Sequence, residues 1–284
     1  MKLPKNFQFN QSNLQDFVDC QRRFQLKYLL SLTWPSVEAQ PVVEYERRTE
    51  LGSLFHQMVH QYTLGIPANM LHVSSRYEEL VPWWENFQYA ISESGTIHDA
   101  WQTSSQRFAE VTVNGVLADA RVVAKLDLVA INSNGKVSIF DWKTTRQPPK
   151  RTWLAERIQT ILYPWLLVQA GAFLNNNHTI LPEQVEMIYW YAELPKAPVR
   201  FPYNQRKMQA DQEELIKIIK KITQLEDSEF NMTSDEHKCS FCVYRSLCVR
   251  GVQAGQLSDY DHLDGEVDED QFILDFNQIE DISY

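Results

Sequence analysis

Hydrophobic and polar residues follow two periodicities along the chain, and each predicts one kind of element. Apolar side chains spaced three or four residues apart predict helices. This spacing occurs at residues 13–30, 44–64, 77–93, 152–170 and 205–225. Alternation at every second residue, or a short unbroken apolar run, predicts strands at 107–113, from 116 through 131, at 137–143 and at 185–193. Helices interspersed with strands predict an α/β fold.

Short polar motifs mark the ends and turns of these elements. Ser12 is expected to cap the first helix. Asn114-Gly115 has the composition of a type I′ hairpin turn, and residues 132–135 form a second hairpin motif. The strands around these turns are expected to form a three-stranded antiparallel meander. The helix at 152–170 allows a right-handed crossover that brings the strand at 185–193 into the same sheet.

The strand at 137–143 carries the first sign of chemistry. Asp141 and Lys143 lie two positions apart on one face of it, and both of its faces are otherwise largely apolar. We expect such a strand at the centre of a sheet, where these groups are costly to bury unless paired, metal-bound or open to a cleft. Asp127 lies in the preceding strand, so two neighbouring strands offer two carboxylates and a lysine.

These three groups suit the hydrolysis of phosphodiesters. Two carboxylates can hold a hard divalent cation such as Mg²⁺, which stabilises charge on phosphoryl oxygens and lowers the pKa of an attacking water. The lysine orients that water or offsets the developing negative charge. For an isolated Asp-x-Lys pair, a structural ion pair is the more common role. Glu110 is either an accessory acid or an exposed structural glutamate.

The helix at 152–170 adds further polar groups. Gln159 and Tyr163 are four residues apart and therefore lie on one helix face, which can be directed back at the carboxylates. A basic run before and within this helix suits a phosphate backbone, although such runs are more often solvated faces. The run comprises Lys143, Arg146, Lys150, Arg151 and Arg157.

The charge distribution is compatible with a nucleic-acid partner despite a net charge of −10. Ten of the 37 acids lie in residues 251–284, which contain no lysine or arginine, so 27 acids and 27 bases remain in the body. This acidic tail is expected to be flexible, and its apolar cluster at 272–276 to dock on a partner protein or in a basic groove. With no signal peptide or membrane-length apolar run, a cytoplasmic protein is expected.

All four cysteines fall into one pattern, with one near the N-terminus and three clustered near the C-terminus. They are Cys20, Cys239, Cys242 and Cys248. A disulfide framework is not expected in an intracellular chain. Four thiolates suit either Zn²⁺ or an iron-sulfur cluster, and His237 is an additional candidate ligand. Either group would join the two ends of the chain and close a loop of more than ~200 residues.

The order and spacing of these motifs resemble those of RecB-like nucleases in the PD-(D/E)XK superfamily, from about residue 14 to residue 248. The resemblance rests on Gly52-Ser53-Leu54-Phe55-His56, Leu126-Asp127, Phe140-Asp141-Trp142-Lys143-Thr144-Thr145 and Gln159-Thr160-Ile161-Leu162-Tyr163. It implies a restriction-endonuclease-like core, a mixed central sheet flanked by helices, with a helical N-terminal part. Two positions depart from the pattern: Lys125-Leu126 replaces a small residue before the first acid, and His60 stands where some members have an acid.

The resemblance also implies roles for individual residues. His56, which alone would be read as an ordinary helix histidine, binds Mg²⁺ or Mn²⁺ together with Asp127 and Asp141. Lys143 is catalytic, and Gln159 and Tyr163 contribute to the active site. The cysteine spacing is similar to that of the iron-sulfur subset, which includes AddB-type subunits and CRISPR-associated exonucleases, and it implies a 4Fe-4S cluster rather than structural zinc. DNA is the implied partner, with Arg146, Lys150 and Arg151 as candidate contacts.

We therefore expect one nuclease domain at 1–254, with the cluster as a C-terminal clip, followed by an acidic tail at 255–284. The expected function is metal-dependent cleavage of DNA, by an exonuclease acting on single-stranded or end-bearing DNA in repair, recombination or CRISPR adaptation. The alternative is a non-catalytic DNA-binding or assembly module that keeps the nuclease fold.

Overall fold

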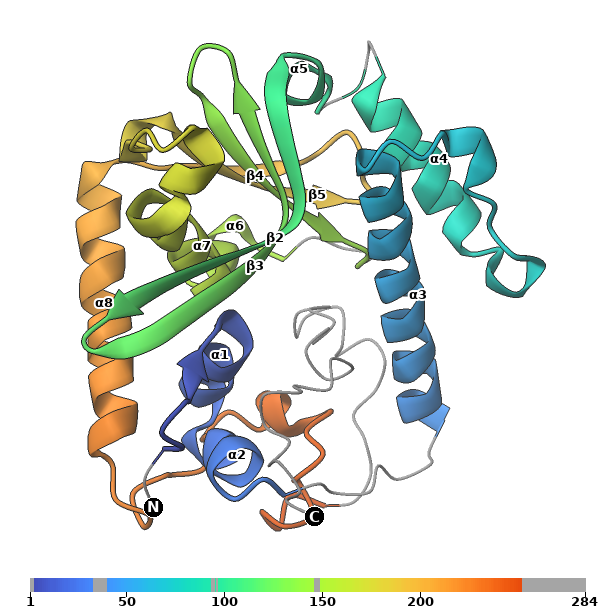
Figure 1. The fold of residues 1–284 in the computed structure, drawn as a ribbon. Helices are drawn as coiled ribbons and strands as arrows, with labels where there is room; N and C mark the ends of the chain where they lie inside the picture. Colours follow the sequence, from blue (N-terminus) through green and yellow to red (C-terminus); the bar gives the residue numbers. More distant parts are fainter. Residues whose placement is uncertain (1–2, 33–39, 93–94, 96, 146–148, 252–284) are drawn as a thin grey trace, which may run out of the picture.

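The structure is a computed structural model that describes residues 3–32, 40–92, 95, 97–145 and 149–251, with side chains of its longest helix described from Arg47 onward. Arg146 and the acidic tail lie outside the described residues. A mixed sheet lies between two groups of helices (Figure 1). Within the described ranges, no helix has both the length and the apolar content that crossing a membrane requires.

The sheet has the strand order β1-β3-β4-β5-β6, and β2 pairs with β3. The antiparallel meander of β2, β3 and β4 is confirmed, and β4 runs parallel to β5 as expected of a crossover. Two short strands, β1 and β6, were not predicted. The strands are β1 (Gln8–Phe9), β2 (Ser104–Leu117), β3 (Ala120–Asn132), β4 (Val137–Lys143), β5 (Val185–Tyr191) and β6 (Val199–Pro202).

Each face of the sheet has its own hydrophobic core. One core contains Ile139 and Met187 and packs against α1 (Gln11–Asp19), α7 (Ile158–Ala170) and α8 (Gln205–Gln224). The other contains Phe140 and Trp190 and packs against α3 (Gln40–Thr63), α4 (Leu80–Ile91) and α5 (His98–Gln102). The short helices are α2 (Gln21–Phe24), η1 (Gln25–Leu29), η2 (Ala68–Met70), η3 (Ser75–Tyr77), α6 (Arg151–Ala155), η4 (Gly171–Asn175), η5 (Pro182–Gln184) and η6 (Glu236–Cys239).

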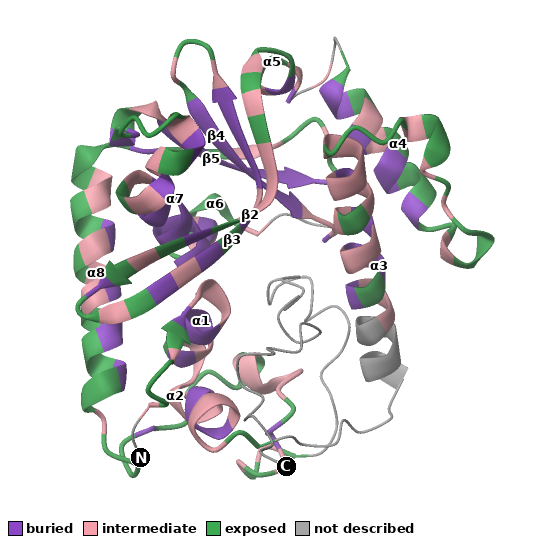
Figure 2. Cartoon of the chain, in the orientation of Figure 1, coloured by how far each residue is buried: buried purple, intermediate pink, exposed green. Residues whose placement is uncertain are grey.

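Strand β4 is covered on both sides, as its composition predicts. Figure 2 shows β4 and β5 as buried along nearly their whole lengths. Side chains alternate between the two cores, so Val137 and Ile139 face α7 while Phe140 and Trp142 face α3. Asp141 and Lys143 therefore approach the α7 side of the sheet.

Replacing Trp190 with alanine is expected to lower the free energy of unfolding by about 3–5 kcal/mol, because a fully buried aromatic leaves a large cavity. Trp190 is 0% exposed and stacks on Phe55 with ring centroids 6.1 Å apart. Urea unfolding measures the loss. Val116→Ala, at a position 71% exposed, is the control and should change stability little. A loss below about 1 kcal/mol in the tryptophan variant contradicts this packing.

The first hairpin turn lies later than Asn114-Gly115, so that prediction was wrong. Strand β2 continues through both residues, and the turn consists of Ala118 and Asp119, with φ of 50° and 63°. Positive φ at both central residues is the type I′ pattern. Gly115 instead faces α7, where a Cβ would lie 2.6 Å from Leu166 Cδ1. Close packing, and not a turn, requires this glycine.

Two predicted long helices are each divided. The helix at 13–30 is interrupted at Cys20, whose extended backbone (φ −160°, ψ 109°) separates α1 from α2. Asn10, not Ser12, caps α1 by accepting a hydrogen bond from the Asn13 N–H at 2.8 Å. The helix at 152–170 is divided into α6 and α7, and Arg157 has extended backbone before α7. The apolar spacing continues across both interruptions, so periodicity alone could not locate them.

Candidate active site

Strands β3 and β4 separate at the two predicted carboxylates. Their pairing covers only 128–131 of β3, with Leu128 opposite Phe140. The same register places Asp127 opposite Asp141, just beyond the last pair. The Trp142 N–H donates a hydrogen bond to Asp127 Oδ2 at 2.8 Å. Because β3 and β4 are no longer paired here, the Trp142 N–H has no carbonyl partner on β3. The Asp127 carboxylate accepts its hydrogen bond instead.

Glu110 reaches the same place from β2. Ala109 pairs with Leu128 and Val111 pairs with Leu126, so Glu110 lies opposite Asp127. Its φ of 52° is left-handed, which is uncommon for a residue other than glycine. Its side chain is 15% exposed and forms an ion pair with Lys125. Glu110 is therefore not an exposed structural glutamate. Three carboxylates form a row across β2, β3 and β4.

His56 approaches this row from helix α3. Its Nε2 lies 2.9 Å from the Trp142 carbonyl oxygen, which can only accept a hydrogen bond, so in the neutral form of the ring, the form that binds metal, Nε2 carries the proton. Its Nδ1 then presents a lone pair and lies 3.5 Å from Asp127 Oδ2. A carbonyl that fixes the ring in this way is typical of metal-binding histidines. One ligand atom each from His56, Glu110 and Asp127 lie within 4.8 Å of one another.

Asp141, Lys143 and Gln159 form a second, closed group of contacts. Lys143 Nζ lies 2.9 Å from Asp141 Oδ2 and donates a hydrogen bond to Gln159 Oε1 at 3.1 Å. Gln159 Nε2 donates to Asp141 Oδ1, so a single amide binds both members of the pair. Asp141 is 3% exposed, and the Lys143 side chain is 12% exposed. Pairing at both ends offsets the cost of burying the two charges.

Tyr163 lies on the helix face predicted from its spacing to Gln159, but its hydroxyl is directed elsewhere. It is 6% exposed and donates to Gln11 Oε1 of α1 at 3.1 Å. Among the described residues, Asp141 is not part of the ligand group around His56. Apart from Tyr163, the structure therefore places the predicted residues in two groups, one around Asp127 and one around Lys143.

Of the predicted DNA-contacting residues, Lys150 and Arg151 are described, and they lie before and at the start of α6. Lys150 is exposed and immediately precedes the helix. Arg151 is also exposed, but its guanidinium lies 4.3 Å from the centre of the Phe201 ring and donates to the Arg200 carbonyl oxygen at 2.7 Å. Arg157 is only 8% exposed and lies 3.7 Å from Asp19. The described members of the basic run are therefore divided: Lys150 and Arg151 lie on the surface, Arg157 is buried, and Lys143 belongs to the group around Asp141.

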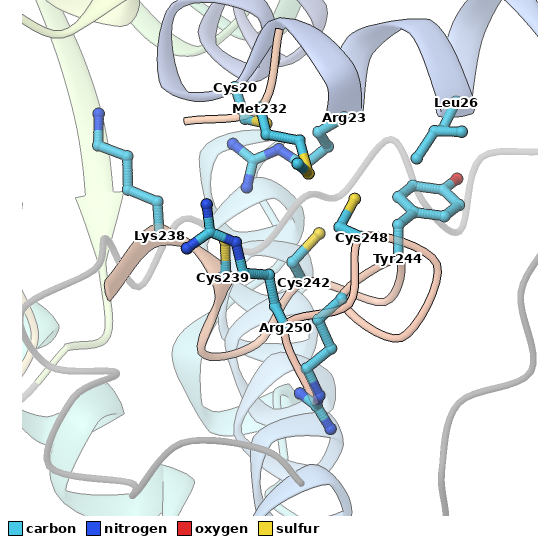
Figure 3. Close-up of a pocket in the computed structure, with 11 residues that line it drawn as sticks. Cys20, Arg23, Leu26, Met232, Lys238, Cys239, Cys242, Tyr244, Cys248 and Arg250 are labelled. Carbon is cyan, nitrogen blue, oxygen red and sulfur yellow. The ribbon is translucent and has the colours of Figure 1, made fainter. Parts of the chain in front are cut away.

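All four cysteines line one pocket between the N-terminal helices and the C-terminal segment (Figure 3). Cys20 comes from the interruption between α1 and α2, and Cys239, Cys242 and Cys248 come from the loop below it. None of the four forms a disulfide bond. His237 is exposed and does not line this pocket. The donor set fits a four-cysteine centre, either zinc or an iron-sulfur cluster.

Two charged residues near the pocket, Asp19 and Arg23, affect the ionisation of the groups around it. Burial raises the pKa of the Cys242 thiol, and the nearby Arg23 opposes that effect. Burial would raise the pKa of Asp19, but Arg157, Arg23 and Lys238 outweigh it and lower that pKa below its ordinary value. A permanently charged arginine beside thiols favours their thiolate forms, which are the forms that bind metal.

Comparison with known proteins identifies a family. The family model of the PD-(D/E)XK nuclease superfamily matches residues 8–249. No curated protein matches.

Two solved structures are similar over most of both chains, although distantly. SSO0001 has 14% sequence identity and a TM-score of 0.42, with 86% of each chain covered. A structure named "Putative exonuclease" from Eubacterium rectale has 12% identity and a TM-score of 0.48, with 81% of this chain and 85% of that chain covered. Because the family model covers the sheet, the divided helices and all four cysteines, the chain belongs to the PD-(D/E)XK nuclease superfamily.

Proposed function

We propose that this chain is a metal-dependent DNA nuclease whose active site lies where β3 and β4 separate. The observation that carries the proposal is the convergence of His56, Glu110 and Asp127 within 4.8 Å, beside the Asp141 and Lys143 pair. Membership of a nuclease superfamily gives the reaction class. The rival function is a DNA-binding or assembly module that keeps the fold without cutting.

Different residues of the site have different proposed roles. His56, Glu110 and Asp127 would hold a divalent cation, with Asp141 as the further carboxylate that the sequence predicts. Bound there, Mg²⁺ or Mn²⁺ supplies Lewis-acid stabilisation of phosphoryl oxygens and lowers the pKa of a water ligand. Lys143 places a positive charge where the phosphate becomes more negative during attack. Gln159 holds Asp141 and Lys143 at a fixed separation.

If the His56 imidazole binds the metal, it should affect which metal ion supports cleavage. Mg²⁺ prefers oxygen ligands, whereas transition metals such as Mn²⁺ accept nitrogen more readily. His56→Ala should therefore raise the Mn²⁺ concentration needed for half-maximal cleavage by roughly tenfold or more.

His60→Ala is the matched control for this experiment. His60 lies one turn further along α3 and is not part of the ligand group found among the described residues. Its replacement should leave the Mn²⁺ dependence near that of the wild type. Equal effects of the two substitutions contradict a role for His56 as a ligand.

We propose in addition that the four cysteines hold a 4Fe-4S cluster, as in the iron-sulfur subset of RecB-like nucleases. Four thiols on one pocket support a tetrathiolate centre, and the resemblance favours iron over zinc. The centre would join segments that are more than ~200 residues apart, where a cross-link removes much of the unfolded chain's entropy.

The proposed substrate is single-stranded or end-bearing DNA, in repair, recombination or CRISPR adaptation. The acidic tail is proposed to dock on a partner protein, on the strength of its sequence alone. The experiment compares labelled linear single-stranded, linear double-stranded and closed circular DNA, each with Mg²⁺, Mn²⁺ or EDTA. Metal-dependent loss of the linear substrates supports an exonuclease. Tight DNA binding without cleavage under every condition supports the rival module.

A further inference from the structure

Three polar residues of α1 form a stripe that faces the start of α7. Gln11, Gln15 and Asp19 are spaced four residues apart, so they lie on one face of the helix. Gln11 Oε1 accepts a hydrogen bond from the Tyr163 hydroxyl at 3.1 Å. Gln15 Oε1 accepts from the Ile158 N–H at 3.0 Å, and Asp19 lies 3.7 Å from Arg157.

The middle contact supplies a cap that α7 does not make for itself. Arg157 occupies the N-cap position of α7 and forms no side-chain capping bond there. The first amides of a helix have no partner within the helix and need one from outside. Gln15 is 7% exposed and fills this need for Ile158 from a different helix. The stripe therefore fixes where α7 begins.

The start of α7 is also the part of the helix that serves the active site. Gln159 is the second residue of α7 and binds both Asp141 and Lys143. We propose that Gln11, Gln15 and Asp19 are positioning residues that hold α7 so that Gln159 keeps Asp141 and Lys143 in register. This inference rests on the proposed nuclease function. It adds residues that act through Gln159 and are not among those proposed to hold the metal.

The far end of the stripe reaches the cysteine pocket. Asp19 precedes Cys20 and forms an ion pair at 2.8 Å with Lys238, which precedes Cys239. One carboxylate thus contacts both the cysteine-bearing segment and Arg157 at the start of α7. Asp19 therefore connects the C-terminal segment to α7, the helix that carries Gln159.

The first test replaces Gln15 with methionine, which has similar size but only a weak acceptor, and with glutamate, which keeps a strong acceptor. In steady-state DNA cleavage, Gln15→Met should lower kcat roughly 10- to 100-fold with KM within about twofold, because misplacing catalytic groups slows the reaction without weakening binding. Gln15→Glu should keep kcat within about threefold of the wild type. Equal loss in both variants overturns the inference.

The second test does not depend on activity. Hydrogen exchange measured by mass spectrometry should show the peptide containing the first turn of α7 exchanging roughly five- to tenfold faster in Gln15→Met, with α8 unchanged. Unchanged exchange at α7 overturns the inference even when kcat falls. If the wild type does not cleave DNA, the proposed function fails, and the exchange result alone decides whether the stripe holds α7.

A second pair of variants covers the outcome that Gln15→Met does not fold. Asp19→Asn should loosen α7 and lower kcat in the same way. Asp16→Asn is its control on the same helix, since Asp16 pairs with Arg23 and Lys27 and not with α7. Faster hydrogen exchange at the first turn of α7 in Asp19→Asn, but not in Asp16→Asn, supports the inference. Equal exchange in the two variants overturns it.

Discussion

Lys143→Ala is expected to lower the rate of DNA cleavage by roughly 100- to 1,000-fold, the usual cost of removing one fixed group that stabilises charge in the transition state. The ammonium group is held by Asp141 at 2.9 Å and by Gln159 at 3.1 Å, so it is positioned before substrate arrives. Single-turnover cleavage of labelled DNA, with enzyme in excess, measures the chemical step. Affinity for DNA should change little, because one phosphate contact at most is lost.

Lys136→Ala is the matched control. Lys136 precedes β4 whereas Lys143 ends it, so the two lysines flank the same strand at opposite ends of the sheet. The Lys136 side chain is 47% exposed and pairs with Glu186, away from the carboxylates. Its loss should leave the cleavage rate within about twofold of the wild type. Cleavage by Lys143→Ala at the wild-type rate contradicts the proposed role of the lysine.

Cys20→Ser is expected to remove the metal centre and lower the thermal midpoint by on the order of 10 °C, because binding of the centre is coupled to folding. Protein purified without oxygen should be brown, with broad absorbance near ~400 nm, and the variant should be bleached. Iron and sulfide analysis together with thermal unfolding measures both effects. Of the four cysteines that line the pocket, Cys20 is the one contributed by the N-terminal part of the chain.

Val243→Ala is the control for the cysteine variant. Val243 follows Cys242 directly but is 44% exposed, so its loss should change neither colour nor midpoint appreciably. A colourless wild-type protein that carries one equivalent of zinc would show that the four cysteines hold structural zinc and not an iron-sulfur cluster. A wild type that holds neither iron nor zinc contradicts the proposed centre.

The position of the central strand and of its carboxylate, Asp141, could be predicted because the local sequence pattern determines it. A strand that is apolar on both faces is stable only when covered on both sides, and β4 lies between β3 and β5 with 3% of Asp141 exposed. The four-residue spacing of Gln159 and Tyr163 placed them on one helix. The hydroxyl of Tyr163 turned to α1, which spacing within one helix cannot reveal.

The misplaced hairpin turn left the role of Glu110 open between an accessory acid and an exposed structural glutamate. A turn at Asn114-Gly115 pairs Val113 with Val116 and leaves Glu110 opposite Asp119. The observed turn pairs Leu117 with Ala120 and brings Glu110 opposite Asp127. Turn propensity favoured Asn-Gly, but Gly115 is paired within β2 and packs closely against Leu166, a residue distant in sequence. The signal available was an acidic residue between the apolar neighbours Ala109 and Val111.

Cys20 shows a second limit of periodicity. Its extended backbone interrupts a run whose apolar spacing reads as one continuous helix. The cysteine pocket and the contact between the Arg22 N–H and the Asn231 carbonyl oxygen, at 3.1 Å, both depend on a segment about 200 residues away. Sequence pattern predicts elements and spacing well, but it does not predict breaks imposed by partners distant in sequence.

The dependence of cleavage on Mg²⁺ in the wild type and in Asp127→Asn tests the central claim most directly. Asp127 links the diverging strands to the ligand group, through Trp142 and through His56. We expect the wild type to cut linear DNA with Mg²⁺ and to stop with EDTA, while Asp127→Asn binds the same DNA and leaves it uncut. Cleavage by Asp127→Asn at the wild-type rate, or by the wild type in excess EDTA, would contradict a metal-dependent site between β3 and β4.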